Sequence, residues 1–175
     1  PNYTWKYAAQ FAYQLAWVVA HLHSRDIVIG DFNQNNIAVD PVFNTIILID
    51  CDSFDITDPK TGEHFPCTVG LPEMLAPELQ DVGSLSKGHF SKESDNFSLA
   101  IHIFRLLMDN ADPFGGIITV DGSASVSDIP ANRAIVNGEC AYVRNVPGKR
   151  MPDWSPKMEM LPGDLMKLFK KTFYY

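Results

Sequence analysis

Two short apolar runs with turn-forming residues between them constrain this sequence most. Ile37–Val39 and Ile46–Ile49 are rich in β-branched residues, which favour strands. Asp40-Pro41 and Asn44 separate the runs, and these residue types are typical of turns. The pattern predicts a β-hairpin, which would bring the residues before the first run close to those after the second.

Helical periodicity is found on both sides of the hairpin. Apolar residues at helical spacing predict helices over residues 5–23 and 93–108, and Pro162 opens a last one. The predicted apolar faces comprise Phe11, Leu15, Val18 and Leu22 in the first helix, Phe97, Leu99, Ile103, Leu106 and Leu107 in the second, and Leu165, Leu168, Phe169 and Phe173 in the last. We expect a mainly α chain, α+β overall, with one short hairpin.

The remaining segments are less regular. Ile27–Gly30 is short and apolar and is predicted to be a strand. A long loop is predicted from Asp50 to Glu78, because turn residues recur along it. The Gly-, Pro- and Ser-rich region 117–160 offers one short helix, near Asn132–Asn137.

The composition narrows the range of functions. With a net charge of −7 and a pI near 5.1, the chain lacks the basic character expected for binding nucleic acids or membrane surfaces. Cys51, Cys67 and Cys140 are far apart and form no CxxC pair, which argues against a zinc site. Widely spaced, unpaired cysteines favour a cytoplasmic location, and no apolar run is long enough to cross a bilayer.

Three polar residues flank the predicted hairpin and form the main candidate site. Asn36 directly precedes the hairpin and Asp50 directly follows it, so their side chains are expected to lie close together. An amide oxygen and a carboxylate are hard ligands that suit Mg²⁺. Asp31 lies on the loop before the hairpin, where it is placed to accept a proton from an attacking hydroxyl group.

These residues resemble the catalytic segments of protein kinases. Asp31 matches the catalytic-base aspartate of that family, and Asn36 matches its metal-binding asparagine. Asp50 matches the aspartate of the Asp-Phe-Gly motif, which here reads Asp50-Cys51-Asp52.

Further motifs follow in the order found in the family. Ala76-Pro77-Glu78 resembles the Ala-Pro-Glu motif, whose glutamate is paired with an arginine in related kinases. Asp95 lies in a segment that resembles the central helix whose aspartate holds the catalytic-loop backbone, and Asp112-Pro113-Phe114 resembles the turn after that helix. A closer likeness is to a bacterial kinase-like branch with the motifs Ile-Gly-Asp, Ile-Asp-Cys-Asp-Ser-Phe and Pro-Glu-Leu-Gln, found here at 29–31, 49–54 and 77–80.

The resemblance implies that residues 1–175 form the C-terminal lobe of a protein-kinase-like domain, without the N-terminal lobe. It further implies ATP and Mg²⁺ as cofactors, with Asn36 and Asp50 as metal ligands. The implied partners are ATP, a protein substrate or regulator, and the missing N-lobe. The implied reaction is phosphoryl transfer to a protein hydroxyl, as in serine/threonine kinases, and the isolated chain is expected to be inactive.

Several positions depart from the family pattern. His-Arg-Asp is replaced by Ile29-Gly30-Asp31, the catalytic-loop lysine by Asn33, its threonine partner by Leu71, and the glycine of Asp-Phe-Gly by Asp52. These changes keep two alternatives open: a pseudokinase scaffold or regulatory binding module, and a small-molecule kinase. The family's arginine partner of the Ala-Pro-Glu glutamate is also missing. We therefore expect Glu78 to be exposed or paired with a substitute cation.

Overall fold

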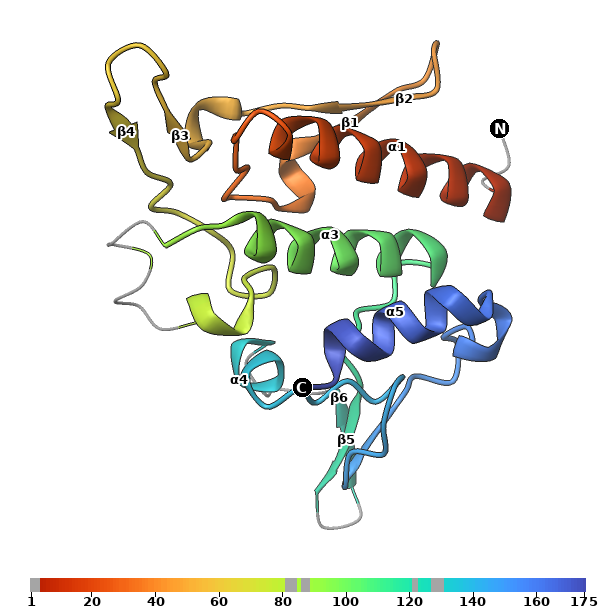
Figure 1. Cartoon of the computed structure of the whole chain (residues 1–175). Helices are drawn as coiled ribbons and strands as arrows, with labels where there is room; N and C mark the ends of the chain where they lie inside the picture. The colour runs from red at the N-terminus through yellow and green to blue at the C-terminus, as the bar shows by residue number, and fades with distance from the viewer. Residues whose placement is uncertain (1–3, 81–84, 86–88, 121–122, 127–130) are drawn as a thin grey trace.

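Two long helices lie side by side at the centre of the molecule (Figure 1). The computed structural model describes residues 4–80, 85, 89–120, 123–126 and 131–175. Helix α1 (Trp5–His23) packs against α3 (Lys92–Leu107), and α5 (Gly163–Phe173) packs against α3 on the side away from α1. The predicted helix over 5–23 is confirmed, and the predicted helix over 93–108 lies within one residue of α3 at each end.

A β-hairpin covers the other side of α1 (Figure 1). Strand β1 (Ile37–Asp40) pairs antiparallel with β2 (Thr45–Leu48), with Ile37 opposite Leu48. The Asp40 carboxylate accepts two backbone N–H groups within the turn, which is a common role for aspartate. The predicted hairpin is therefore confirmed.

The side chain of Gln14 joins the hairpin to α1. Its amide nitrogen donates to the carbonyl oxygen of Asn44 at 3.0 Å, and its amide oxygen accepts from the N–H of Ile46 at 2.9 Å. These two bonds fix the turn end of the hairpin against the helix.

The predicted strand over Ile27–Gly30 is not formed. Only Val28 pairs, through an isolated bridge to Asp55. The N–H groups of Ile29 and Gly30 donate instead to a side-chain carboxylate, and Gly30 has a φ of 74°, outside the strand region.

The long segment from Asp50 to Glu78 contains short elements that the sequence did not indicate. These are η2 (Cys51–Ser53), the paired strands β3 (Ile56–Thr57) and β4 (His64–Phe65), and η3 (Pro77–Leu79). Each is two or three residues long, so the segment still runs mainly as loop.

The C-terminal part adds a small antiparallel sheet and a short helix. Strands β5 (Ile117–Val120), β6 (Ser123–Val126) and β7 (Lys149–Arg150) are ordered β6-β5-β7, and α4 (Ala131–Val136) is the short helix expected near Asn132–Asn137. The sheet was not predicted. The described chain is thus mixed α and β, which is compatible with the expected α+β class, but it has two small antiparallel sheets beyond the one expected hairpin.

Aromatic rings pack against one another in the larger core. Phe104, Phe169 and Phe173 are fully buried and contact one another through their rings. Phe169 and Phe173 lie four residues apart on α5, so they share one face of the helix. Leu168, which was expected on that face, is 50% exposed because the adjacent position points about 100° away.

A second, smaller cluster lies between α1 and the hairpin and supports the candidate site. Leu15 and Val19 of α1 pack with Ile29 and Phe32 of the following loop. All four side chains are buried, so the loop that carries Asp31 is anchored on both sides of this residue.

Among the described residues, no helix combines the length and the apolar character needed to span a membrane.

Candidate functional site

The buried carboxylate of Asp95 organises the loop before the hairpin. It accepts hydrogen bonds from the backbone N–H groups of Ile29 at 2.7 Å and Gly30 at 3.0 Å. His23, at the end of α1, places Nε2 2.9 Å from the same carboxylate. Burial is the main cause that raises the pKa of Asp95, and the three hydrogen bonds oppose it. One side chain of α3 therefore ties the loop to the end of α1.

A second residue of α3 holds the loop about two helical turns after Asp95. His102 is buried, and its Nε2 lies 3.1 Å from the carbonyl oxygen of Phe32. Its ring also packs at an angle against the ring of Phe32. Asp31 thus lies between two fixed points, Gly30 and Phe32.

Asp31 is held by the two asparagines that follow it. Asn33 Nδ2 donates to Asp31 Oδ1 at 2.9 Å, and Asn36 Nδ2 donates to the Asp31 carbonyl oxygen at 2.9 Å. Both asparagines are buried, whereas Asp31 is partly exposed. The carboxylate of Asp31 is therefore oriented by the protein and still accessible to a second molecule.

The base of the hairpin brings Asn36 and the Asp50 region together. The N–H of Ile49 donates to the carbonyl oxygen of Asn36 at 2.9 Å, and Asp50 is the next residue. Asp50 adopts a left-handed conformation with a φ of 58°. This conformation turns the chain out of the strand direction immediately after the hairpin.

Three carboxylates gather where the chain turns. A hydrogen bond with Asp52 and the charge of Asp52 are the main causes that raise the pKa of Asp50, and the charge of Asp31 raises it further. Asp31, Asp50 and Asp52 line one open pocket of about 330 Å³, together with Ser53, Pro66, Cys67, Thr68 and Val69. Two of the predicted site residues, Asp31 and Asp50, thus face the same space.

The other predicted residues lie around this pocket without lining it. Asn33 and Asn36 bind Asp31 from the protein side, and Asp95 supports the loop from behind. Glu78 lies on η3 and is exposed, which is one of the two outcomes expected for it.

Cys67 is a residue of the site that no sequence pattern indicated. Its side chain is 1% exposed and packs against Gly30, and its N–H donates to the carboxylate of Asp55 at 3.0 Å. Burial raises the pKa of the thiol. Cys67 is 37 positions away from Gly30 along the chain, so no local pattern could have indicated the contact.

Asn36 and Asp50 are the residues of the site that carry oxygen donors of the kind Mg²⁺ takes. Within the described residues, no group of three or more His, Cys, Asp or Glu side chains is arranged to hold a metal ion. Asn36 uses its amide nitrogen for Asp31, which leaves its amide oxygen available, and Asp50 adds a carboxylate. Two hard oxygen donors match the few protein ligands that Mg²⁺ takes beside water and phosphate.

Comparison with known proteins relates the chain to bacterial kinases. No family model matches it. It is 32% identical over 177 residues to "Protein kinase YegI" of Escherichia coli O157:H7, and equally identical to the protein of that name from strain K12. Each match covers 99% of this chain and 26% of the relative. The chain therefore spans about a quarter of the length of these curated relatives, and its relationship to them is kinase-like.

Proposed function

We propose that this chain forms the catalytic lobe of a protein-kinase-like enzyme that transfers the γ-phosphoryl group of ATP to a protein hydroxyl group. The observation that carries the proposal is the arrangement of Asp31, which is oriented by Asn33 and Asn36 and shares an open pocket with Asp50. The kinase relatives support the same assignment.

Asp31 acts as the proton acceptor in this proposal. Its carboxylate faces the pocket, and the bond from Asn33 Nδ2 to Oδ1 leaves Oδ2 as the oxygen more available to an incoming hydroxyl group. Asn36 Nδ2 lies 3.4 Å from Oδ2, so this oxygen has only a long, weak contact within the protein. A fixed carboxylate next to the reacting hydroxyl is what general base catalysis requires.

Asn36 and Asp50 would hold magnesium. The ion, when bound, would neutralise charge on the transferred phosphoryl group. The chain itself supplies the amide oxygen of Asn36 and the carboxylate of Asp50. The hydrogen bond with Asp52 and the nearby negative charge raise the pKa of Asp50, and a cation would offset that charge. Asn33 replaces the lysine of serine/threonine kinases, so contact with the γ-phosphate at this position would lack a positive charge.

Phosphoryl transfer is the direct test. The protein as the cell makes it should be incubated with [γ-³²P]ATP, Mg²⁺ and a generic acceptor such as myelin basic protein. Asp50→Ala should abolish transfer. Asp31→Asn should lower kcat by roughly 10²-fold or more while nucleotide affinity changes little, because a base acts mainly in the transition state.

Asp153→Asn is the matched control. Asp153 is an exposed aspartate whose described partner is Arg150, far from the site in sequence, and its substitution should leave transfer unchanged. If Asp31→Asn has no more effect than Asp153→Asn, Asp31 does not have the proposed role.

A binding module without catalysis is the second candidate function. The observation that favours it is the engagement of Asp31 by Asn33, which occupies one carboxylate oxygen. In that case Asp50→Ala would weaken Mg²⁺-dependent ATP binding in calorimetry, and phosphoryl transfer would be absent in the wild type as well.

A further inference from the structure

Asp55 is a buried aspartate to which the proposed reaction assigns no role. Only 8% of the residue is exposed, and it does not line the pocket of Asp31 and Asp50. Its backbone forms a bridge to Val28, three residues before Asp31. The N–H of Asp55 donates to the carbonyl oxygen of Val28 at 2.9 Å, and the N–H of Val28 donates back at 3.1 Å. Asp55 therefore has a fixed place beside the loop that carries Asp31.

Both carboxylate oxygens of Asp55 bind residues further along the chain. Oδ2 accepts the backbone N–H of Cys67 at 3.0 Å, and Oδ1 lies 2.8 Å from Nε2 of His64 in β4. Hydrogen bonds to an ionised acceptor are stronger than bonds between neutral groups, and their loss in a buried place is costly. The side chain of Asp55 therefore fixes β4 and the backbone of Cys67 to a point beside the loop of Asp31.

The stretch that Asp55 holds forms part of the wall of the candidate site. Residues 66–69 line the pocket as one continuous run. Cys67 is buried and packs on Gly30, the residue before the proposed base, whereas Thr68 is exposed. Within the described residues, no hydrogen bond uses the backbone N–H or the carbonyl oxygen of Thr68. An exposed run with backbone groups that no described residue uses suits an extended polypeptide.

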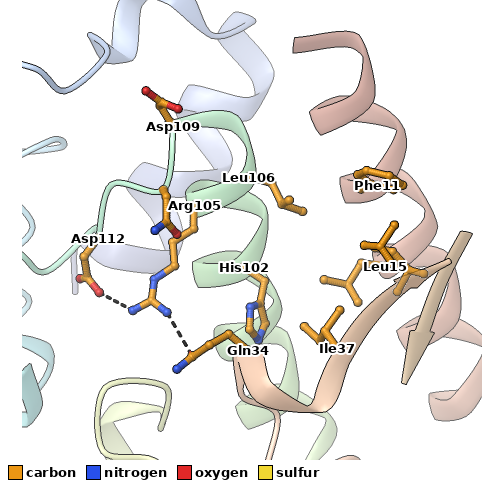
Figure 2. A pocket seen from close by; sticks show the side chains of 12 residues that line it. Phe11, Leu15, Gln34, Ile37, His102, Arg105, Leu106, Asp109 and Asp112 are labelled. Atoms are coloured by element: carbon orange, nitrogen blue, oxygen red, sulfur yellow. Dashed lines mark hydrogen bonds and ion pairs between the residues drawn. The ribbon is translucent and has the colours of Figure 1, made fainter. Parts of the chain in front are cut away.

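The loop of Asp31 is held in place without the side chain of Asp55. Three side chains of α3 bind this loop, namely Asp95, His102 and Arg105. The last of them donates to the side-chain oxygen of Gln34 at 3.3 Å, three residues after Asp31 (Figure 2). Loss of the Asp55 carboxylate should therefore displace residues 66–69 and leave the loop of Asp31 in position.

We propose that Asp55 is a positioning residue for phosphoryl transfer, which holds residues 66–69 where they receive the polypeptide that carries the acceptor hydroxyl group. It acts through Cys67, whose contact with Gly30 sets the place of this run relative to the carboxylate of Asp31. This role rests on the proposed function and deepens it, because it assigns an extended polypeptide as the acceptor. Other residues would bind the nucleotide and magnesium, so the affinity for ATP should not depend on Asp55.

Steady-state transfer by the protein as the cell makes it, with myelin basic protein as the acceptor, tests this role. Asp55→Ala should raise the KM for the acceptor about tenfold, while kcat and the KM for ATP change by less than about threefold. Asp55→Asn keeps an oxygen for the N–H of Cys67 and an amide group that can bond to His64, so its KM for the acceptor should stay close to that of the wild type. Asp58→Ala is the matched control. The carboxylate of Asp58 accepts the N–H of Lys60 in the turn between β3 and β4, and its loss should leave all three constants unchanged.

Alkylation by iodoacetamide reports the position of residues 66–69 without an assay of transfer. Cys51 is exposed, whereas Cys67 and Cys140 are buried, and mass spectrometry can follow the three thiols separately. In Asp55→Ala, Cys67 should react at least about tenfold faster than in the wild type, with Cys51 as the internal standard. Cys140 lies in the larger core and should stay unreactive. If Cys140 reacts as well, the variant has unfolded. His64→Ala, which removes one of the two bonds, then takes its place and should raise the KM for the acceptor by a smaller factor.

The outcomes separate this role from the proposed function. A folded variant that transfers phosphate with an unchanged KM for the acceptor overturns the role of Asp55 and leaves the proposed function intact. Two further results also overturn it: a Cys67 thiol that stays unreactive in Asp55→Ala, and an equal rise of the KM for the acceptor in Asp55→Asn and Asp55→Ala. Absence of transfer by the wild type overturns the proposed function itself, and this role with it.

Discussion

The carboxylate of Asp95 accepts the N–H of Ile29 at 2.7 Å, and this bond joins the middle of the fold to the loop that carries Asp31. Asp95 is 1% exposed and also accepts the N–H of Gly30. Two backbone donors and one histidine therefore depend on a single buried side chain. The loop geometry at the candidate site is a consequence of this arrangement.

Asp95→Ala should destabilise the protein strongly. The substitution leaves the N–H groups of Ile29 and Gly30 without their acceptor in a buried region, and we expect a loss of about 3 kcal/mol in the free energy of unfolding. Urea unfolding followed by circular dichroism would measure it. The exposed Glu93→Ala, two residues earlier on α3, is the control and should change stability by less than about 0.5 kcal/mol. Equal effects of the two substitutions would contradict this account of Asp95.

Gly30 is expected to tolerate no side chain. Its φ is 74°, and a Cβ atom there would lie 2.5 Å from Sγ and 2.6 Å from Cβ of Cys67. Gly62 has nearly the same φ, 73°, but has open space around it, so it isolates the backbone contribution. Gly62→Ala should cost about 1 kcal/mol, and Gly30→Ala should cost roughly 2 kcal/mol more because of the contact. Cys67→Ala should not rescue Gly30→Ala, because the Cβ of residue 67 remains. Matching unfolding midpoints for the two glycine variants would show that the contact is unimportant.

The elements that could be predicted from the sequence depend on local patterns. The helical spacing of the apolar residues in α1 can be seen within a short stretch of sequence, and so can the turn residues between β1 and β2. The structure has both elements where they were expected. Asn36 and Asp50 are fourteen positions apart in the sequence. The hairpin explains why they lie near each other in space, because the N–H of Ile49, the residue before Asp50, donates to the carbonyl oxygen of Asn36. Local signals therefore sufficed to place Asn36 and Asp50 on either side of the hairpin, whereas the loop of Asp31 depends on Asp95 and His102.

The features that could not be predicted depend on contacts between distant segments. Ile27–Gly30 has the composition of a strand, but Asp95, more than sixty positions later, takes two of its N–H groups. The β5–β7 pairing joins residues about thirty positions apart in a region without clear periodicity. The packing of Cys67 on Gly30 likewise leaves no signal in either local sequence.

His102 should make the stability of the protein depend on pH in mild acid. Burial lowers its pKa from 6.5 to about 4, so the unfolded chain binds a proton more readily than the folded one. The contribution of neutral His102 to the free energy of unfolding is complete above pH 6.5. It is lost progressively as the pH falls towards 4, by about 3 kcal/mol in total. His102→Gln keeps a donor for the Phe32 carbonyl and should flatten the decline measured by urea unfolding between pH 7 and 4.5. His89→Gln, at an exposed position, should leave the slope unchanged. A decline that persists in His102→Gln would assign it to other groups.

The effect of the negative charge around Asp50 should be measurable when the Asp50 carboxyl group is titrated. The hydrogen bond and the charge of Asp52 raise the pKa of Asp50, and the charge of Asp31 adds to this. Asp52→Asn should therefore bring the pKa of Asp50 down towards its usual value, as observed by the ¹³C shift of its carboxyl carbon in NMR. Asp31→Asn should produce a smaller decrease, because the charge of Asp31 is the last of the contributing causes. Asp153→Asn, whose partner is Arg150, is the control and should produce none.

Adding Mg²⁺ should lower the pKa of Asp50 in the wild type if this carboxylate is a ligand, because a bound cation favours the ionised form. A pKa that responds to Asp52→Asn but not to Mg²⁺ would keep the electrostatic description of the pocket and remove Asp50 from the proposed magnesium site.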